Sequence, residues 1–385
     1  MAIKWNTEAY FEKASRGSFA AKAARADVYR SNSEIFRAGA YETASGKTVT
    51  LNPESMLSGT IVYDASIDVP EVPQCEAPVT GVVNAGCLEI GRELQLKGYN
   101  PVILNLADAY MACGFYKRGS SAQEESLCRQ TTLSQALYQY YDAEDASACG
   151  VAFREKKYPM DLRHGAFYSP HVTVFRKGSR DGYALLDEPY ETAIISCAAL
   201  DFNEKHGKNR EYRAADGGFT REGGEIMTDK IRTIYGAALA AGHDALVLGA
   251  FGCGAFRLRP DLVAQLFHEV LFEPAFRNRF RAVAFAILEK SGPESGVNGK
   301  FGPFYRVFGR YGTAQKTMMP PAPKAPAVDM STYAVGQTVA HDKFGTGTVT
   351  GIQSEMGRVT VDFVGFGTKT LAVEKAKLKI GRAHV

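Results

Sequence analysis

The residues best suited to chemistry are three consecutive polar side chains, Gln123, Glu124 and Glu125, called the Gln-Glu-Glu triplet below. A carboxylic acid can give a proton to a leaving oxygen and then, as a carboxylate, activate a water molecule. Acidic residues in the first turn of a helix also interact favourably with its dipole, which is the ordinary structural interpretation. Adjacent carboxylates point in different directions on a helix, so they are not expected to act as a symmetric pair. One could hold a hydroxyl group while the other transfers the proton.

Two glycine-containing loops follow segments that are predicted to be strands. The first runs from Asn105 through Cys113 and Gly114 to the triplet, and the second is Gly249–Phe256, directly after Ala245–Leu248. Loops at the carboxyl ends of strands bind ligands in open α/β folds, and glycines there let backbone N–H groups approach phosphate oxygens. Neither loop has the GxGxxG or P-loop lysine pattern, so a Rossmann dehydrogenase or an NTPase is not indicated. Two such loops favour phosphate recognition over tight turns without a ligand.

Other reactive residue types give weaker indications. The 7 histidines contain no HxxxH or HxH pair, and the 7 cysteines contain no CxxC pair. We therefore expect no metal site, no zinc ribbon, no disulfide framework and no cofactor. Cys113 and Cys253 lie in the two loops, and a cysteine nucleophile with a histidine base is a less favoured alternative.

The elements that must position these residues alternate between helices and strands. Buried strands are predicted at Val102–Leu106, Thr192–Cys197, Ala245–Leu248 and Ala282–Leu288, and helices at Asn6–Phe36, Glu124–Tyr141, Ile226–Ala241 and Pro260–Leu271. Alternation of this kind is typical of an α/β layered fold with a largely buried sheet.

Composition excludes several classes of protein. The chain has 385 residues, 45% hydrophobic and 23% charged, which indicates a globular protein of more than one domain. A net charge of +3 does not indicate nucleic-acid binding over the whole surface. The longest apolar stretches, Ala245–Phe256 and Ala282–Leu288, are shorter than the about 20 residues that cross a bilayer. Because Met1–Lys22 also lacks the apolar core of a signal peptide, we expect a cytoplasmic protein without a membrane partner.

A proline-rich segment divides the chain. Residues 313–330 contain four prolines and few large apolar side chains, which is typical of a semi-rigid linker, although a surface loop within one domain is an alternative. Residues 331–385 contain short β-branched runs separated by glycine turns, which predict a small all-β barrel. The predicted domains are therefore 1–312, with a helical part at about 1–45, and 331–385.

The first loop and the triplet resemble the bacterial-type poly(ADP-ribose) glycohydrolases. The similarity lies in Asn105–Tyr110, in Cys113-Gly114 and in Ala122–Arg129, and it extends over roughly Arg25–Glu289. Further similar segments, in the same order, are Leu88–Leu96, Tyr168–Pro170, Val174–Arg176 and His243–Phe256.

This resemblance implies a macrodomain-like fold, a three-layer mixed sheet that binds ADP-ribose at the carboxyl ends of its strands. It implies that Glu125 is the general acid, that Glu124 holds a ribose hydroxyl, and that Phe256 confines the distal ribose. Such an enzyme cleaves an O-ribosyl bond as positive charge grows at the anomeric carbon. The substrate-binding residues implied by the resemblance are Gln123, Asn105, Cys113, Gly114, Phe115, Gly249, Gly252, Cys253, Gly254, Ala255 and Phe256.

The chain departs from the family at one point. The family's three loop glycines fall on Cys113, Gly114 and Phe115, so a phenyl ring could obstruct the diphosphate or shift the loop. This implies either a different ADP-ribosylated substrate or a non-catalytic reader of ADP-ribose. The two retained carboxylates favour the enzyme, and the two lost glycines favour the reader.

The C-terminal unit has a resemblance of its own. Gly336–Val349, Val361–Phe363 and Gly367–Leu371 are similar to the Tudor/SH3-like barrel at the end of UvrD-type DNA helicases. This similarity implies a module that recruits a protein or nucleic-acid partner, and the alternative is a purely stabilising domain. A third interpretation of the whole chain is a nucleic-acid or polymerase adaptor that carries a degenerate enzyme domain.

Overall fold

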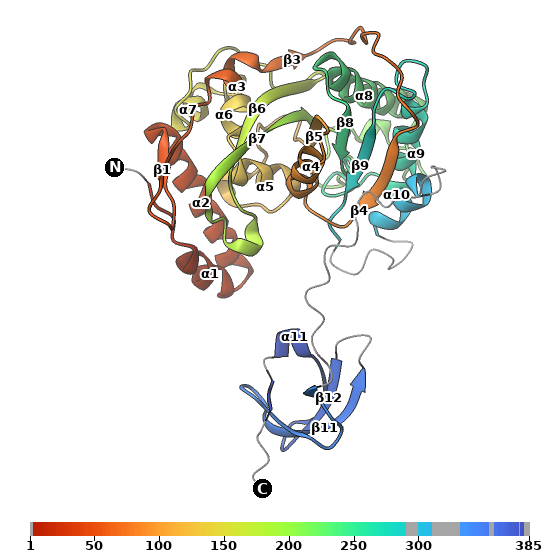
Figure 1. Ribbon diagram of the computed structural model, residues 1–385. Helices are drawn as coiled ribbons and strands as arrows, with labels where there is room; N and C mark the ends of the chain where they lie inside the picture. Colours follow the sequence, from red (N-terminus) through yellow and green to blue (C-terminus); the bar gives the residue numbers. More distant parts are fainter. Residues whose placement is uncertain (1–2, 290–298, 310–331, 354–357, 377, 381–385) are drawn as a thin grey trace. The chain divides into compact units, whose positions relative to one another are not determined.

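A computed structural model describes residues 3–289, 299–309, 332–353, 358–376 and 378–380. The chain forms two units, Met1–Met318 and Met319–Val385, which are described separately (Figure 1). The predicted linker, 313–330, lies outside the described residues. The predicted domain limits therefore stay a prediction.

The first unit is built on a seven-stranded mixed sheet with the order β3-β6-β7-β5-β8-β9-β4. The strands are β3 (Ile61–Tyr63), β4 (Val79–Val83), β5 (Pro101–Leu106), β6 (Ala166–Arg176), β7 (Leu185–Cys197), β8 (Ala245–Leu248) and β9 (Ala282–Ala286). Strands β7, β5, β8, β9 and β4 pair in parallel, whereas β6 runs antiparallel to both of its neighbours. The parallel strands end at one edge of the sheet, so the loops after β5 and β8 meet there. This agrees with the predicted α/β fold.

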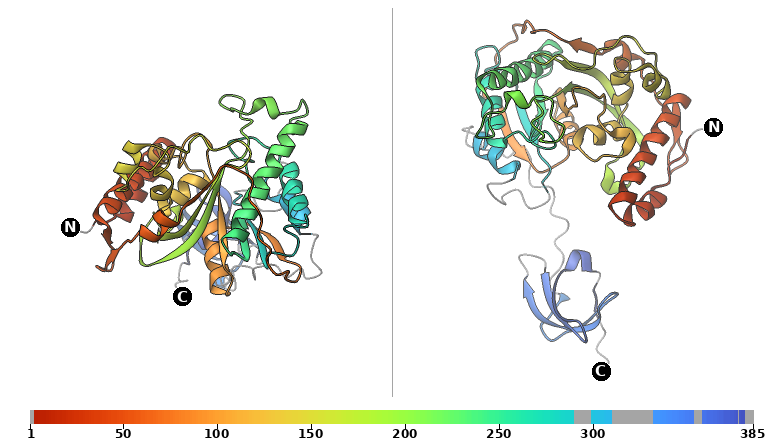
Figure 2. Two further views of the ribbon diagram at one scale, coloured as in Figure 1. Left: turned by 90° about the horizontal axis from the view of Figure 1, so that it is seen from above. Right: turned by 180° about the vertical axis from the view of Figure 1, so that it is seen from behind.

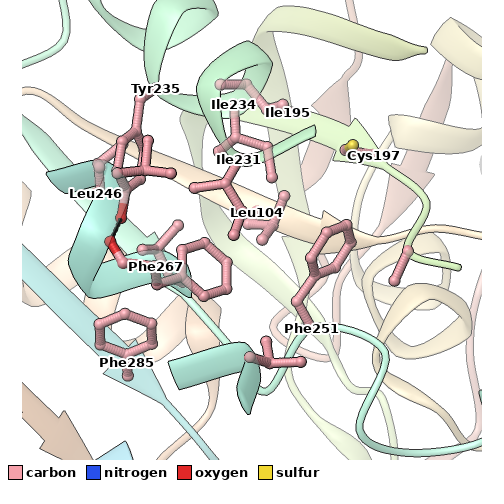
Figure 3. Close-up of a cluster of buried hydrophobic side chains, with 14 of the residues drawn as sticks. Leu104, Ile195, Cys197, Ile231, Ile234, Tyr235, Leu246, Phe251, Phe267 and Phe285 are labelled. Atoms are coloured by element: carbon pink, nitrogen blue, oxygen red, sulfur yellow. Dashed lines mark hydrogen bonds between the residues drawn. The ribbon is translucent and has the colours of Figure 1, made fainter. Parts of the chain in front are cut away.

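Helices cover both faces of this sheet (Figures 1 and 2). One face carries Leu104, Ile195 and Leu246, which pack against buried side chains of α8 (Arg221–Ala240) and α9 (Pro260–Leu271), as Figure 3 shows. On this side, α10 (Phe301–Phe308) adds Phe304 and Phe308 to the same core.

The opposite face carries α4 (Cys87–Leu96) and α5 (Gln123–Gln130). A Cβ at Gly91 of α4 would lie 2.7 Å from Ile103 Cδ1, so a glycine is required for α4 to lie this close to β5. Since Ile103 and Asn105 are two residues apart on one strand, they share this face.

The predicted helix Glu124–Tyr141 is wrong in its length. It is two helices, α5 and α6 (Leu133–Tyr138), separated at Thr131 and Thr132. The Thr131 hydroxyl donates to Leu127 O at 2.8 Å and accepts from Leu133 N at 3.2 Å, while Thr132 N donates to Thr173 O at 3.0 Å. These hydrogen bonds take the place of the backbone bonds of a continuous helix, because a threonine hydroxyl can bond to nearby backbone N–H and C=O groups.

The predicted N-terminal helix Asn6–Phe36 is also divided in two. It forms α1 (Thr7–Ser15) and α2 (Ser18–Ala38), and Gly17 between them has φ +124°, outside helical geometry. The predicted helical part then ends in a hairpin of β1 (Ala40–Glu42) and β2 (Thr48–Thr50). The remaining elements are α3 (Glu54–Gly59), α7 (Ala143–Ala148) and the short helices Tyr116–Arg118, Ser179–Asp181 and Arg210–Tyr212.

The second unit is a five-stranded antiparallel sheet with the order β13-β12-β11-β10-β14. Its strands are β10 (Thr338–His341), β11 (Gly345–Gln353), β12 (Arg358–Phe363), β13 (Gly367–Ala372) and β14 (Lys379–Ile380), with helix α11 (Val373–Ala376) after β13. Its core contains Val339, Val349, Val359, Val361 and Phe363. No strand pair within the described residues joins β13 to β14, so the unit is an antiparallel sheet rather than a demonstrated closed barrel. Over the described ranges, no helix is long and apolar enough to cross a membrane.

Candidate active site

The Gln-Glu-Glu triplet forms the first turn of α5, and Gln123 attaches this turn to the end of β5. Its Oε1 accepts from Leu106 N at 2.9 Å, and its Nε2 donates to Leu104 O at 2.8 Å. The side-chain amide therefore bonds to the strand as a neighbouring backbone would. This contact fixes the start of α5 and therefore the positions of the next two residues, Glu124 and Glu125.

Glu124 is only 4% exposed and is bound through both carboxylate oxygens. Its Oε1 accepts from Asn105 Nδ2 at 3.2 Å, and its Oε2 accepts from Asp108 N at 3.0 Å. Asn105 Nδ2 also donates to Ser196 Oγ on β7 at 3.0 Å. Burial, and then the charge of Glu125, raise the pKa of Glu124 well above its usual range. Glu124 is therefore a firmly held group that keeps its proton to a higher pH than an ordinary glutamate.

Glu125 has one oxygen bound and one without a partner. Its Oε1 accepts from Phe115 N at 3.1 Å. Its Oε2 is buried and has no hydrogen-bond partner within the described residues, and the same is true of Asn105 Oδ1. A buried polar atom without a partner costs about 1–3 kcal/mol, so each such atom requires an explanation. A ligand hydroxyl that donates to Glu125 Oε2 would satisfy that oxygen.

Gly114 allows the two carboxylates to come together. A Cβ at this position would lie 2.8 Å from Glu125 Oε1 and 3.1 Å from Glu124 Oε2, and the residue has φ +52°. Both the space and the backbone conformation therefore require glycine.

The two non-glycine positions of the first loop behave differently. Cys113 is buried and has φ +64°, a left-handed conformation that is unfavourable for a side chain. Phe115 has φ −90°, so its backbone does not need glycine. Its ring is 42% exposed and lies 5.4 Å from the Arg118 guanidinium. The loop thus keeps its N–H contact to Glu125 despite the phenylalanine.

The second loop, Gly249–Phe256, joins β8 to α9 and lies beside the first. A Cβ at Gly249 would lie 3.4 Å from Leu106 Cδ1 at the end of β5. Gly252 has φ +70°, and a Cβ there would lie 2.5 Å from Leu258 Cδ1. Phe256 is partly buried against the main core, and its carbonyl accepts from Phe202 N at 2.9 Å. The structure therefore brings the two predicted loops together at one edge of the sheet.

A pocket of about 640 Å³ borders the second loop. Its lining contains no acidic residue and consists of Asn203, Cys253, Gly254, Ala255, Arg257, Leu258, Pro260 and Lys300. Neither the Arg257 nor the Lys300 side chain makes an ion pair with another described residue. Among the described residues, the pocket therefore offers two positive charges without an ion-pair partner next to exposed backbone, which favours an anion. Its lining does not include Glu124 or Glu125, so the pocket borders the second loop and not the carboxylates themselves.

Cysteine and metal chemistry have less support. Burial raises the pKa of both Cys113 and Cys253, which keeps each thiol protonated and a weak nucleophile. In the described part of the chain, no group of three or more His, Cys, Asp or Glu side chains could hold a metal ion.

The family profile described as microbial-type PARG, catalytic domain, matches residues 30–177, which contain the first loop and the triplet. A comparison with curated proteins finds no match. Residues 30–177 thus match the catalytic domain of a glycoside-cleaving hydrolase, in agreement with the enzyme class predicted from the sequence.

Solved structures extend the similarity over most of the first unit. The poly(ADP-ribose) glycohydrolase from Thermomonospora curvata is 25% identical with a TM-score of 0.58, and the match covers 74% of this chain and 100% of that one. The same enzyme bound to the inhibitor ADP-HPD is 26% identical with a TM-score of 0.56, over 74% of this chain and 100% of that one. The enzyme from Deinococcus radiodurans in complex with ADP-ribose is 24% identical over 68% of this chain and 98% of that one, with a TM-score of 0.50, and shows the fold alone.

Sequence reasoning missed four residues of this region. Asp108 lies in a motif that the sequence analysis quoted, and its Oδ1 accepts from Tyr110 N and Met111 N at 2.8 and 2.9 Å, which shapes the turn after β5. An aspartate whose carboxylate accepts from the backbone N–H groups two and three residues later is typical of such a turn. Asp108 could therefore have been identified as the start of a turn. Ser196, Arg257 and Lys300 give no local pattern, because Ser196 bonds to Asn105 and the pocket that contains Arg257 and Lys300 is formed by segments distant in the sequence.

The two loops offer a matched test of the role of Gly114. Gly114→Ala should lower the free energy of unfolding, because left-handed backbone costs an alanine about 1–2 kcal/mol and its Cβ would collide with both carboxylates. Gly254→Ala should be tolerated, since a Cβ there meets no atom within 4 Å. Denaturant unfolding of the two variants decides, and equal stability would contradict the convergence of the carboxylates at Gly114.

Proposed function

We propose that this chain is an ADP-ribosyl glycohydrolase, which cleaves O-glycosidic ribosyl bonds of ADP-ribose attached to a polymer, a protein or a nucleic acid. The observation that carries this proposal is the buried pair Glu124 and Glu125, in which only Glu125 Oε2 has no partner among the described residues. We further propose that the first unit is macrodomain-like and acts in the cytoplasm.

In the proposed reaction, Glu125 gives its proton to the leaving oxygen as the ribosyl bond breaks. Positive charge then grows at the anomeric carbon, next to two carboxyl groups. As a carboxylate, Glu125 removes a proton from the attacking water, which forms the new bond and leaves free ADP-ribose. Glu124, fixed by Asn105 and by the Asp108 amide, holds a ribose hydroxyl. This chemistry needs only side chains and water, so it calls for no cofactor.

The proposed ligand extends from the carboxylates to the second loop. Its diphosphate would lie on the backbone N–H groups of the first loop and of Gly252–Phe256, with Phe256 against the distal ribose. Arg257 and Lys300, in the adjoining pocket, would balance the diphosphate charge. In this arrangement the ribosyl bond lies at the two carboxyl groups, and the phosphates lie nearer to the two basic side chains.

A second candidate function is a reader that binds ADP-ribose without cleaving it. Two features favour it, namely Cys113 in a left-handed conformation and the exposed ring of Phe115 in the loop nearest the carboxylates. A reader would bind ADP-ribose and release none from any modified substrate.

For the second unit, we propose a Tudor/SH3-like adaptor that binds a protein or nucleic-acid partner. The support is an aromatic cluster on one part of the sheet. Phe344 stacks on His341 at a centroid distance of 4.7 Å and lies 5.9 Å from Phe366, whose side chain is exposed. The Lys343 ammonium lies 5.6 Å from the Phe344 ring. Phe344 is partly buried against the core of the unit, whereas Phe366 is exposed. An exposed aromatic ring with a cation nearby is typical of docking surfaces.

Glu125→Gln tests the catalytic assignment. The variant should lose roughly 10²–10⁴-fold in the rate of ADP-ribose release, because the amide cannot transfer the proton. Binding of free ADP-ribose should change little. The control is Glu34→Gln, an exposed carboxyl on α2. Thin-layer separation of released ADP-ribose gives the rate, and wild-type turnover by Glu125→Gln would rule out this role.

The proposed role of the two pocket cations can be tested by measuring the binding of ADP-ribose, without an activity assay. Replacing Arg257 and Lys300 together by glutamine should weaken ADP-ribose binding at least about tenfold, since a charged hydrogen bond contributes about 1.5–3 kcal/mol. Adenosine, which has no phosphate, should bind equally to both proteins. Isothermal titration calorimetry measures this, with Arg180→Gln as a surface control. Unchanged ADP-ribose affinity would place the diphosphate elsewhere.

Truncation after Thr313 separates the two proposed modules. The shortened chain should fold and release ADP-ribose from a small substrate at the full-length rate, because all the proposed site residues precede residue 313. The shortened chain should no longer bind a macromolecular partner that the full-length chain binds. A folded fragment without activity on the small substrate would mean that the second unit completes the active site.

A further inference from the structure

Tyr158 is a buried residue that the proposed reaction does not use. It is 3% exposed, and its hydroxyl has no hydrogen-bond partner within the described residues. Buried tyrosine hydroxyls ordinarily find a partner, so this one indicates an interaction that the protein atoms alone do not supply.

The register of the sheet places Tyr158 in the same layer as Glu124. Asn105 on β5 and Phe167 on β6 are both paired with Ser196 on β7, so the three side chains lie in one row on one face. At one end of this row, Asn105 Nδ2 donates to Glu124 Oε1 at 3.2 Å. At the other end, the Tyr158 ring stacks on Phe167 with a centroid distance of 5.2 Å and an interplanar angle of 15°.

The backbone near Tyr158 is attached to the turn that holds Glu124. Met160 N donates to Ala109 O at 2.8 Å, and the residue before Ala109 is Asp108, whose amide donates to Glu124 Oε2. The row across the sheet and this attachment lead independently to the same carboxylate.

The charges around the two side chains favour a donor at Tyr158. Burial and then the charge of Glu124 raise the pKa of Tyr158 well above its usual range, so the phenol stays protonated. The titratable groups that act on Glu124 or Tyr158 are Glu125, Asp108, Cys113 and Cys128, and none of them is a cation. Ionised Glu124 therefore depends on hydrogen-bond donors for its stabilisation.

We propose that Tyr158 is a positioning residue for Glu124, whose hydroxyl donates to a buried water that in turn donates to the Glu124 carboxylate. A water molecule is the group that ordinarily satisfies such a hydroxyl in a polar interior. Donation to the ionised form favours it, which lowers the pKa of Glu124 against the effects of burial and Glu125. Only the kinetic consequence of this inference rests on the proposed function.

Tyr140 provides a matched control. Its ring also contacts Phe167, with a centroid distance of 5.6 Å. Its hydroxyl, however, accepts from Arg154 Nη1 at 3.1 Å and donates to Thr60 O at 3.4 Å. Removing this hydroxyl perturbs the same aromatic packing without affecting Glu124.

The decisive experiment titrates Glu124 in the free full-length protein. The Cδ resonances of 13C-labelled glutamates are followed against pH, and Glu124 is assigned by its loss in Glu124→Gln. In Tyr158→Phe the Glu124 titration should move up by about 0.5–1 pH unit, the size of one lost hydrogen bond. In Tyr140→Phe it should not move. The pH–rate profile for ADP-ribose release should shift in the same direction, with kcat lowered and KM unchanged.

The outcomes separate this inference from the proposed function. An unchanged or lowered Glu124 titration in Tyr158→Phe would overturn the inference even if the enzyme is active. A wild-type protein that releases no ADP-ribose would overturn the proposed function alone, because the titration uses the free protein. If Tyr158→Phe fails to fold, 3-fluorotyrosine at this position, a stronger donor, should move the titration down. The absence of that shift would equally overturn the inference.

Discussion

The structure of the site depends on the burial of two adjacent carboxyl groups at the start of one helix. Burying them without donors would be prohibitive, and the donors come from the end of β5 and the loop that follows it. Asn105 supplies a side-chain amide, and Asp108 and Phe115 supply backbone N–H groups. The shape of the whole first loop follows from this need, because the backbone must turn twice within a few residues to present those N–H groups. The left-handed conformation of Cys113, unfavourable in itself, is one cost of that turn.

The sheet places the first loop beside the second, so the two loops lie at the same edge. Because β5 and β8 are parallel neighbours, their following loops must be adjacent, and Gly249 lies against Leu106 for that reason. Two carboxyl groups lie near the end of β5. Two cations without an ion-pair partner among the described residues lie after β8, at Arg257, and at the start of α10, at Lys300. Opposite charges after two neighbouring strands match a ligand that reacts at one end and carries phosphates further along. This electrostatic arrangement and the unpartnered Glu125 Oε2 support the glycohydrolase together.

Sequence patterns predicted the parts of the site that are local. The triplet, the two glycine loops and the buried strands are recognisable because a few consecutive residues determine each. The break at Thr131 was missed because it depends on a bond between Thr132 and Thr173 on β6, which no local pattern contains. Strand β6 was not predicted, since Pro170 and His171, with φ +52°, interrupt its alternation at a bulge. Arg257, Lys300 and Tyr158 acquire their surroundings only when distant segments pack, so no spacing rule could have found them.

The most direct test of the central claim is an experimental structure of the protein with ADP-ribose bound. The hydroxyl on the anomeric carbon should lie within hydrogen-bond distance of Glu125 Oε2, the atom that has no partner among the described residues. The diphosphate should lie on the Gly252–Phe256 amides. ADP-ribose bound away from the Gln-Glu-Glu triplet, with Glu125 Oε2 still unpartnered, would contradict the account.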